Sequence, residues 1–270
     1  MDRLSALFEL LADEDPAIIQ QTLLALLEYD EETLAEVLPK WQESSNANIR
    51  KHIHQLEAIR IMRRRRHEFA QMLTEADADL IHGLIDIHML WFDCDSRESI
   101  FQLYAEAAAE AAKYELSTPA KLCEFMIDKE YTSINPADEI IFAENYCLGP
   151  VLESRHATGL VMCILAQAFA ARDSLQLHIA RRPGSFVLVS DNGVVIDPYF
   201  WRISELTTPE TTLFMANNQI LRYLIQTMFI HAIETGSFRY IHTIACAITG
   251  KPDTAVSDFL PYPYNGAPPQ

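Results

Sequence analysis

Residues 135–200 read NPADEIIFAENYCLGPVLESRHATGLVMCILAQAFAARDSLQLHIARRPGSFVLVSDNGVVIDPYF, and this stretch decides the expected fold. A loop and the short segment LGPVLESR lead into an apolar run from about Thr158 to Ala171, which predicts a long buried helix. The segment after it, Arg181–Tyr199, reads as short apolar strands joined by a turn and ending at Asp197-Pro198. A long helix followed by two or three neighbouring strands indicates an α+β core with a small antiparallel sheet.

Helical spacing dominates the chain before this core. Residues 1–66 contain two similar units with a period of 31 residues, LFELLADEDPAIIQQTLLAL and VLPKWQESSNANIRKHIHQL. Each unit has an apolar helix, a polar turn and a second apolar-striped helix. Pro16 directly after Asp15 is typical of a capped helix start. The pattern resembles HEAT-type repeats, whose hairpins bury their apolar stripes by stacking on a neighbour.

The rest of the chain divides into three expected parts. Residues 67–206 form the core, with helices over 77–129, one of which opens on Ser117 or Thr118 before Pro119. Residues 207–250 predict a closing helical hairpin, similar to tetratricopeptide-like helices, with its turn at Thr235-Gly236-Ser237. Residues 251–270 hold five of the thirteen prolines and predict an extended or disordered tail.

Charge and cysteine usage narrow the class of protein. With 38 acidic and 21 basic residues, the formal charge of -17 repels phosphate backbones, so nucleic acid is not an expected partner. The apolar run ending at Ala171 is too short to span a bilayer, and the acidic start does not resemble a signal peptide. Five scattered cysteines without a C-x-x-C favour the reducing cytoplasm. The run Arg63–Arg66 predicts the solvated end of a helix, with an anion site as the alternative.

One helical segment raises the question of a metal site. His82 and Asp86 stand four residues apart, on one face of the helix predicted there. His88 belongs to a different face, so no third ligand is in reach. We therefore expect ordinary polar residues at these positions, and we expect neither a metal nor a cofactor.

Several residues of the 135–200 stretch carry a family resemblance. They are Asn145, Leu148, Val151, Leu152, Glu153 and Arg155, then Pro183-Gly184 with Phe186, and finally Ile196-Asp197-Pro198. Their order resembles that of the transglutaminase-like superfamily, and most closely its SirB-type bacterial branch. That branch has an asparagine-containing loop, V-L-x-x-R-x-G-I-P-x-S-L, a long helix, a P-G-H-F hairpin and I-D-P. The resemblance covers about 65 residues and implies a papain-like core.

The resemblance also implies where catalytic residues would stand. Catalytic members of the superfamily place a cysteine at the start of the long helix, a histidine on the next strand and an aspartate on the following one. These positions fall on or near Gly159, on Ser185 and on Asp197. Glycine supplies no nucleophile, and a serine hydroxyl is no base at neutral pH. We therefore expect a degenerate site without catalytic residues, in which Asp197 caps the turn before Pro198.

Two other residues could replace the missing groups. Cys163 lies one helical turn beyond Gly159 and on the same face, although a cysteine inside an apolar run is typically an unreactive core residue. His156 precedes the helix, but the sequence places no orienting acid beside it.

Two hypotheses for function follow. In the first, the chain is a non-catalytic adaptor or regulator that binds a protein or peptide. Because residues 1–40 carry ten acids and two bases, the partner is expected to present a basic segment. In the second, it is a cysteine-dependent hydrolase or acyltransferase with displaced catalytic residues. The loss of both nucleophile and base favours the first hypothesis. The sequence gives no expectation for the oligomeric state.

Overall fold

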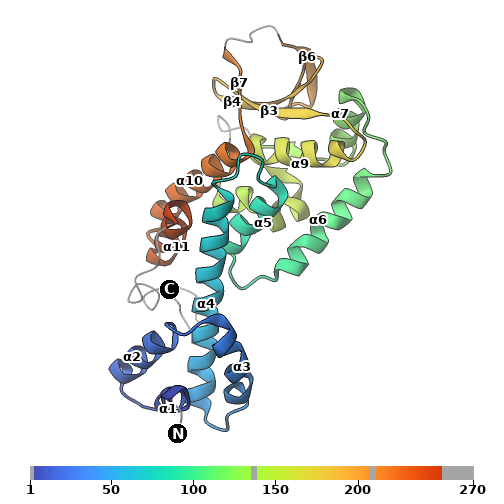
Figure 1. Cartoon of the computed structure of the whole chain (residues 1–270). Coiled ribbons are helices and arrows are strands. Elements are labelled where there is room, and N and C mark those ends of the chain that lie inside the picture. Colours follow the sequence, from blue (N-terminus) through green and yellow to red (C-terminus); the bar gives the residue numbers. More distant parts are fainter. Residues whose placement is uncertain (1–2, 135–138, 207–210, 251–270) are drawn as a thin grey trace.

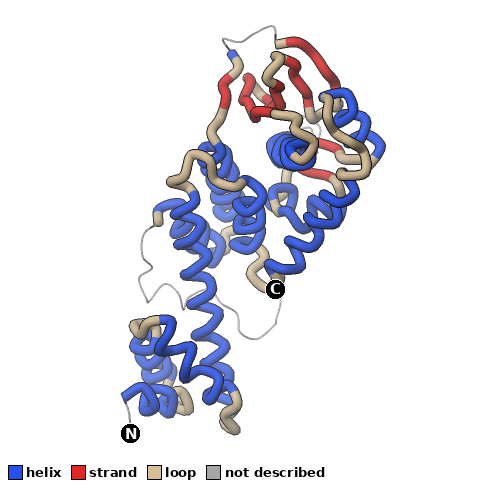
Figure 2. The backbone as a smooth tube through the Cα atoms, turned by 45° about the vertical axis from the view of Figure 1, so that its right-hand side comes forward, coloured by secondary structure: helices blue, strands red, loops and turns tan. Residues whose placement is uncertain are grey.

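The computed structural model describes residues 3–134, 139–206 and 211–250. The chain is an α+β protein, mostly helical, with its main sheet gathered at one end of an elongated molecule (Figures 1 and 2). The predicted fold class is therefore confirmed at this level. The predicted tail, 251–270, lies outside the described residues. None of the described helices is long and apolar enough to cross a membrane.

The first four helices build a separate small core at the end of the molecule far from the sheet (Figure 1). They are α1 (Arg3–Leu10), α2 (Pro16–Leu26), α3 (Glu31–Gln42) and α4 (Ala47–Met72). Asp15 accepts a hydrogen bond from the Ala17 amide at 2.8 Å, which confirms the predicted cap before Pro16. The ring of Phe8 stacks on Trp41 with centroids 5.4 Å apart. Two helical hairpins thus share one interior, as the repeat pattern predicts.

Helix α4 connects this small core to the rest of the molecule (Figure 1). The predicted boundary after residue 66 lies inside it, because the helix continues to Met72. The prediction that Arg63–Arg66 is the solvated end of a helix was wrong. Arg66 is only 2% exposed, and Arg65 donates to the carbonyl oxygens of Met89 and Asp93. Arg65 and Arg66 thus face neighbouring helices, whereas the Arg64 side chain is 53% exposed, and α4 continues beyond the run to Met72.

The helices that follow α4 in the sequence contribute side chains to the main hydrophobic core. They include α5 (Leu80–Trp91), α6 (Arg97–Ala111), α7 (Pro119–Asp128), the 3₁₀ helix η1 (Ala143–Tyr146), α8 (Leu148–Ser154), α10 (Asn217–Thr235) and α11 (Phe238–Thr249). Thr118 caps α7 by accepting from the Lys121 amide at 3.3 Å, as predicted. The turn between α10 and α11 is at Gly236, also as predicted, and both helices lie beside α4 and α5 (Figure 1).

The sheet has five antiparallel strands in the spatial order β6-β5-β4-β3-β7. Their bounds are β3 (Leu177–Arg182), β4 (Ser185–Ser190), β5 (Val194–Asp197), β6 (Arg202–Glu205) and β7 (Leu213–Phe214). Gly184 has φ +78° in the turn between β3 and β4, a conformation that favours glycine. A separate parallel pair joins β1 (Thr132–Ser133) to β2 (His156–Ala157).

Helix α9 (Gly159–Ala171) packs against β3 and β4 beneath the sheet (Figure 1). Its side chains share the main core with Ile179, Leu188 and Ile196, which come from three adjacent strands. The contact between helix 159–171 and strand 186–189 that the resemblance implies is therefore present. This packing fixes the start of α9 beside the β3–β4 turn.

Candidate functional site

A small pocket lies where the start of α9 meets the β3–β4 turn. Its volume is about 170 Å³. It is lined by Ile141, Tyr146, Thr158, Gly159, Leu160, Arg181, Arg182, Gly184, Ser185, Phe186, Tyr199 and Tyr223. Two of the predicted degenerate positions, Gly159 and Ser185, thus face the same cavity. Neither cysteine nor histidine occurs among these described lining residues.

Tyr199 occupies the space at the first residue of α9. A Cβ placed on Gly159 would stand 3.1 to 3.3 Å from three atoms of the Tyr199 side chain, its hydroxyl oxygen among them. Contacts of this length are tighter than carbon atoms normally accept. At the position that the resemblance assigns to a nucleophile, the space for a side chain is therefore occupied by the Tyr199 ring, which comes from the segment after β5.

Asp197 stabilises the turn that carries this tyrosine. Its Oδ1 accepts a hydrogen bond from the Tyr199 amide at 2.9 Å, which agrees with the expected turn-capping role. The carbonyl of Pro198 accepts from the Ser133 hydroxyl at 2.8 Å. Asp197 does not line the pocket, so its carboxylate positions the Tyr199 backbone.

Cys163 lies in the core, away from the pocket lining. Its side chain is fully buried, and burial, reinforced by the charge of Asp197, raises the pKa of its thiol far above the ordinary value. The thiolate, which is the reactive form, is therefore disfavoured at neutral pH. This environment matches the expected unreactive core cysteine.

His156 has an acidic partner that the sequence did not reveal. Its Nε2 lies 3.1 Å from Glu139 Oε2, and its Nδ1 lies 2.8 Å from the Thr132 hydroxyl. The sequence places no orienting acid beside His156, and in the structure Glu139 supplies one from 17 residues earlier in the chain. The pairing of β1 with β2 brings Thr132 beside His156. His156 does not line the pocket.

Asn145 connects the 3₁₀ helix to the start of α9. Its side-chain oxygen accepts from the Phe142 amide at 2.8 Å, and its carbonyl oxygen accepts from the Thr158 amide at 3.3 Å. It holds the wall of the pocket and does not line it.

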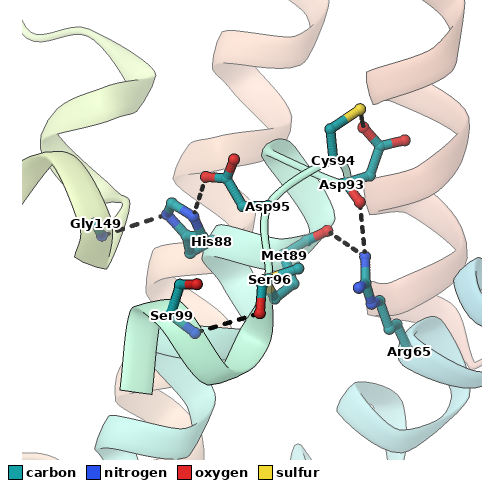
Figure 3. Close-up of polar contacts among 9 residues, drawn as sticks. All are labelled: Arg65, His88, Met89, Asp93, Cys94, Asp95, Ser96, Ser99 and Gly149. Carbon is teal, nitrogen blue, oxygen red and sulfur yellow. Dashed lines mark hydrogen bonds and ion pairs between the residues drawn. The ribbon is translucent and has the colours of Figure 1, made fainter. Parts of the chain in front are cut away.

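The residues considered for a metal each have another partner. His82 pairs with Asp79 at 3.0 Å, and Asp86 forms an ion pair with Arg97. His88 is 1% exposed; its Nε2 lies 2.9 Å from Asp95 Oδ2, and its Nδ1 accepts from the Gly149 amide at 3.3 Å (Figure 3). Because Nδ1 is an acceptor, the imidazole is neutral and donates through Nε2. His88 thus joins α5 to the α5–α6 loop and to α8.

The tyrosine and arginine residues that line the pocket were not predicted from the sequence. Three tyrosines form its walls, and Arg181 lies over the Tyr223 ring, 5.6 Å from its centroid. Thr158, the residue before α9, is 7% exposed, and its hydroxyl has no hydrogen-bond partner among the described residues. The sequence shows Thr158 before a long helix and Arg181-Arg182 before a Pro-Gly turn. It does not show that these residues line one pocket.

Comparison of the chain with family models, curated proteins and solved structures gave no match. The transglutaminase-like core remains a prediction from the sequence. The structure has a small pocket at the start of α9, lined by polar and aromatic residues.

Proposed function

We propose that this chain is a non-catalytic, transglutaminase-like cytoplasmic protein that binds a protein or peptide partner. The observation that carries the proposal is the pocket at the start of α9, where Gly159, Ser185 and Tyr199 meet. Neither cysteine nor histidine is found among its described lining residues, and its concave shape and polar groups suit a binding site. None of the five cysteines forms a disulfide within the described residues, which is in keeping with a reducing compartment.

We also propose that the partner presents a basic segment, because the first three helices carry an acidic surface. Residues 1–40 hold ten acids against two bases. Some of these acids are used internally, since Glu31 pairs with Arg64 at 2.9 Å and Asp15 and Asp30 cap helices. Five others are exposed: Glu9, Glu14, Glu28, Glu32 and Glu36. A cationic segment would be attracted to this surface, and salt would screen the attraction.

The enzyme hypothesis has one observation in its favour. The His156–Glu139 pair is the histidine and acid arrangement that activates a cysteine. The described lining of the pocket contains neither residue, and Cys163 is buried with a raised thiol pKa. A hydrolase or acyltransferase would need a different nucleophile, so binding is the better-supported function.

The proposed binding of a basic segment can be measured on the full chain. The probe is a twelve-residue peptide of alternating lysine and glycine, titrated by calorimetry at low salt and at about 1 M salt, where the screening length is about 3 Å. We expect binding at low salt, loss at high salt, and weaker binding by a variant with Gln at Glu9, Glu14, Glu28, Glu32 and Glu36. A control variant carries Gln at five other exposed acids, Glu75, Glu106, Glu124, Glu130 and Glu205.

The control separates a local surface from overall charge, because both variants lose the same charge. Equal weakening by both would show that the whole acidic chain attracts the peptide. Unchanged binding by the first variant would remove the acidic helices from the proposal.

A further inference from the structure

The start of α9 has no side-chain cap among the residues that the structure describes. The first amides of an α-helix have no partner inside the helix, and a capping side chain usually accepts from one of them. Thr158 holds the cap position of α9 but makes no such bond. Its carbonyl oxygen accepts normally from the Met162 amide at 3.0 Å, so the helix is regular there. The positive end of a 13-residue helix therefore meets the pocket uncapped.

Two side chains at the pocket are also left incomplete. Within the described part of the chain, the hydroxyl oxygen of Thr158 is buried without a hydrogen-bond partner, and so is Nη2 of Arg182. Arg182 Nε donates to the Thr212 hydroxyl at 3.3 Å, which fixes its guanidinium. Buried polar groups without partners are costly, and in native proteins they indicate a missing water, ion or ligand. Both residues line the same cavity.

The other lining groups favour a negative charge over a positive one. Arg181 lies over the Tyr223 ring at the same wall. Burial raises the pKa of Tyr146 to about 12 and also raises the pKa of Tyr199, so both phenols stay neutral and can donate. Asp197, the carboxylate of this region, is bonded to the Tyr199 amide and does not line the cavity. The pocket thus presents two guanidinium groups and several hydroxyl donors.

The size and remaining walls limit the ligand. A volume of about 170 Å³ is well below the range of about 300 to 1,000 Å³ that is usual for ligand and cofactor sites. Ile141, Leu160 and Phe186 add apolar wall beside the donors. A carboxylate with a short aliphatic stem fits this combination, since guanidinium groups and helix-start amides are its common partners.

We infer that the pocket binds a carboxylate on a short aliphatic stem, with its charge at the start of α9 between the Thr158 hydroxyl and Arg182. The inference rests on the proposed function in one respect: it takes this pocket to be the binding site. The carboxylate can belong to a free small acid or to the carboxyl terminus of a peptide.

Calorimetry on the full chain distinguishes these sources. The probes are butyrate and an acetylated tripeptide Gly-Gly-Leu with a free carboxyl terminus, each compared with its amide, in buffer without other carboxylates. We expect the acids to bind and the amides to bind at least about tenfold more weakly, the usual worth of hydrogen bonds to a charged group. Tighter binding of the tripeptide than of butyrate identifies a peptide end; the reverse identifies a free acid.

Matched variants locate the site. Arg182→Gln and Thr158→Val should each weaken acid binding about tenfold, and the amide NMR signals of Gly159 and Leu160 should shift on titration. Arg172→Gln, at the exposed opposite end of α9, should leave binding unchanged. Thr158→Val keeps the test decisive if the arginine variant fails to fold.

The outcomes separate this inference from the proposed function. Equal binding of acid and amide, or no binding of either, would overturn the carboxylate assignment. Equal weakening by Arg172→Gln and Arg182→Gln would overturn the location. Turnover of a substrate, or fast alkylation of Cys163, would instead overturn the non-catalytic function.

Discussion

The side chain of Tyr199 stands 3.1 Å from the point that a Cβ on Gly159 would occupy. The tyrosine comes from the segment after β5, and the glycine is the first residue of α9. The phenol of Tyr199 can occupy this space because Gly159 has no side chain. A side chain at position 159 would require the Tyr199 ring to shift.

Gly159→Ala should destabilise the chain. The added methyl group must displace the Tyr199 ring, and overpacking of this kind typically costs about 1 to 3 kcal/mol. Urea unfolding of Gly159→Ala, Tyr199→Ala and the double variant gives the coupling between the two sites. The double variant should lose less than the two single costs together. Strict additivity would show that the ring does not hold this space.

Thr158→Val should preserve or raise stability, although Thr158 precedes a helix. Its hydroxyl is buried and makes no hydrogen bond to any described residue, so removing it relieves a cost on the order of 1 kcal/mol. The matched control is Thr118→Val, because the Thr118 hydroxyl caps α7 through the Lys121 amide. That variant should lose about 1 kcal/mol. Comparable losses in both variants, measured by thermal unfolding, would contradict the uncapped start of α9.

The local elements of this fold could be predicted from the sequence, whereas contacts between distant segments could not. Asp15 before Pro16 and Thr118 before Pro119 act as caps because a cap depends only on neighbouring residues. The helix at 159–171 follows in the same way from its continuous apolar run.

Contacts between residues far apart in the sequence depend instead on how the segments pack together. His156 and Glu139 are 17 residues apart in the sequence and lie within hydrogen-bond distance in the fold. Tyr199 reaches Gly159 because the segment after β5 passes the start of α9. Arg66 is buried because α4 extends beyond the arginine run. No local pattern encodes these three contacts, so the degenerate positions could be named while the groups that fill the pocket could not.

Stability should fall as pH decreases below about 6.5, partly through His88. Burial lowers the pKa of His88, and the opposing influence of Asp95 and Glu153 is smaller. The unfolded chain therefore binds a proton at a higher pH than the folded chain, so the free energy of unfolding is lost as pH falls from the unfolded pKa, about 6.5, towards the folded one. Protonation at Nδ1 also removes the bond from the Gly149 amide.

Unfolding free energies at pH 7.5 and 5.5 check this prediction. The loss on acidification should be smaller in His88→Gln than in the unaltered chain. His54→Gln, whose side chain is 69% exposed, should keep the full loss. An equal pH dependence in all three proteins would show that His88 is not the titrating group.

The central claim, that this pocket has no catalytic thiol, is tested most directly by the rate of cysteine alkylation. Iodoacetamide labelling of the native chain near neutral pH, followed by mass spectrometry, gives a rate for each cysteine. Because burial raises the thiol pKa of Cys163, Cys123 and Cys147 alike, we predict that Cys163 reacts no faster than these two and more slowly than the exposed Cys94. Rapid, selective labelling of Cys163 in the folded protein would contradict the non-catalytic function.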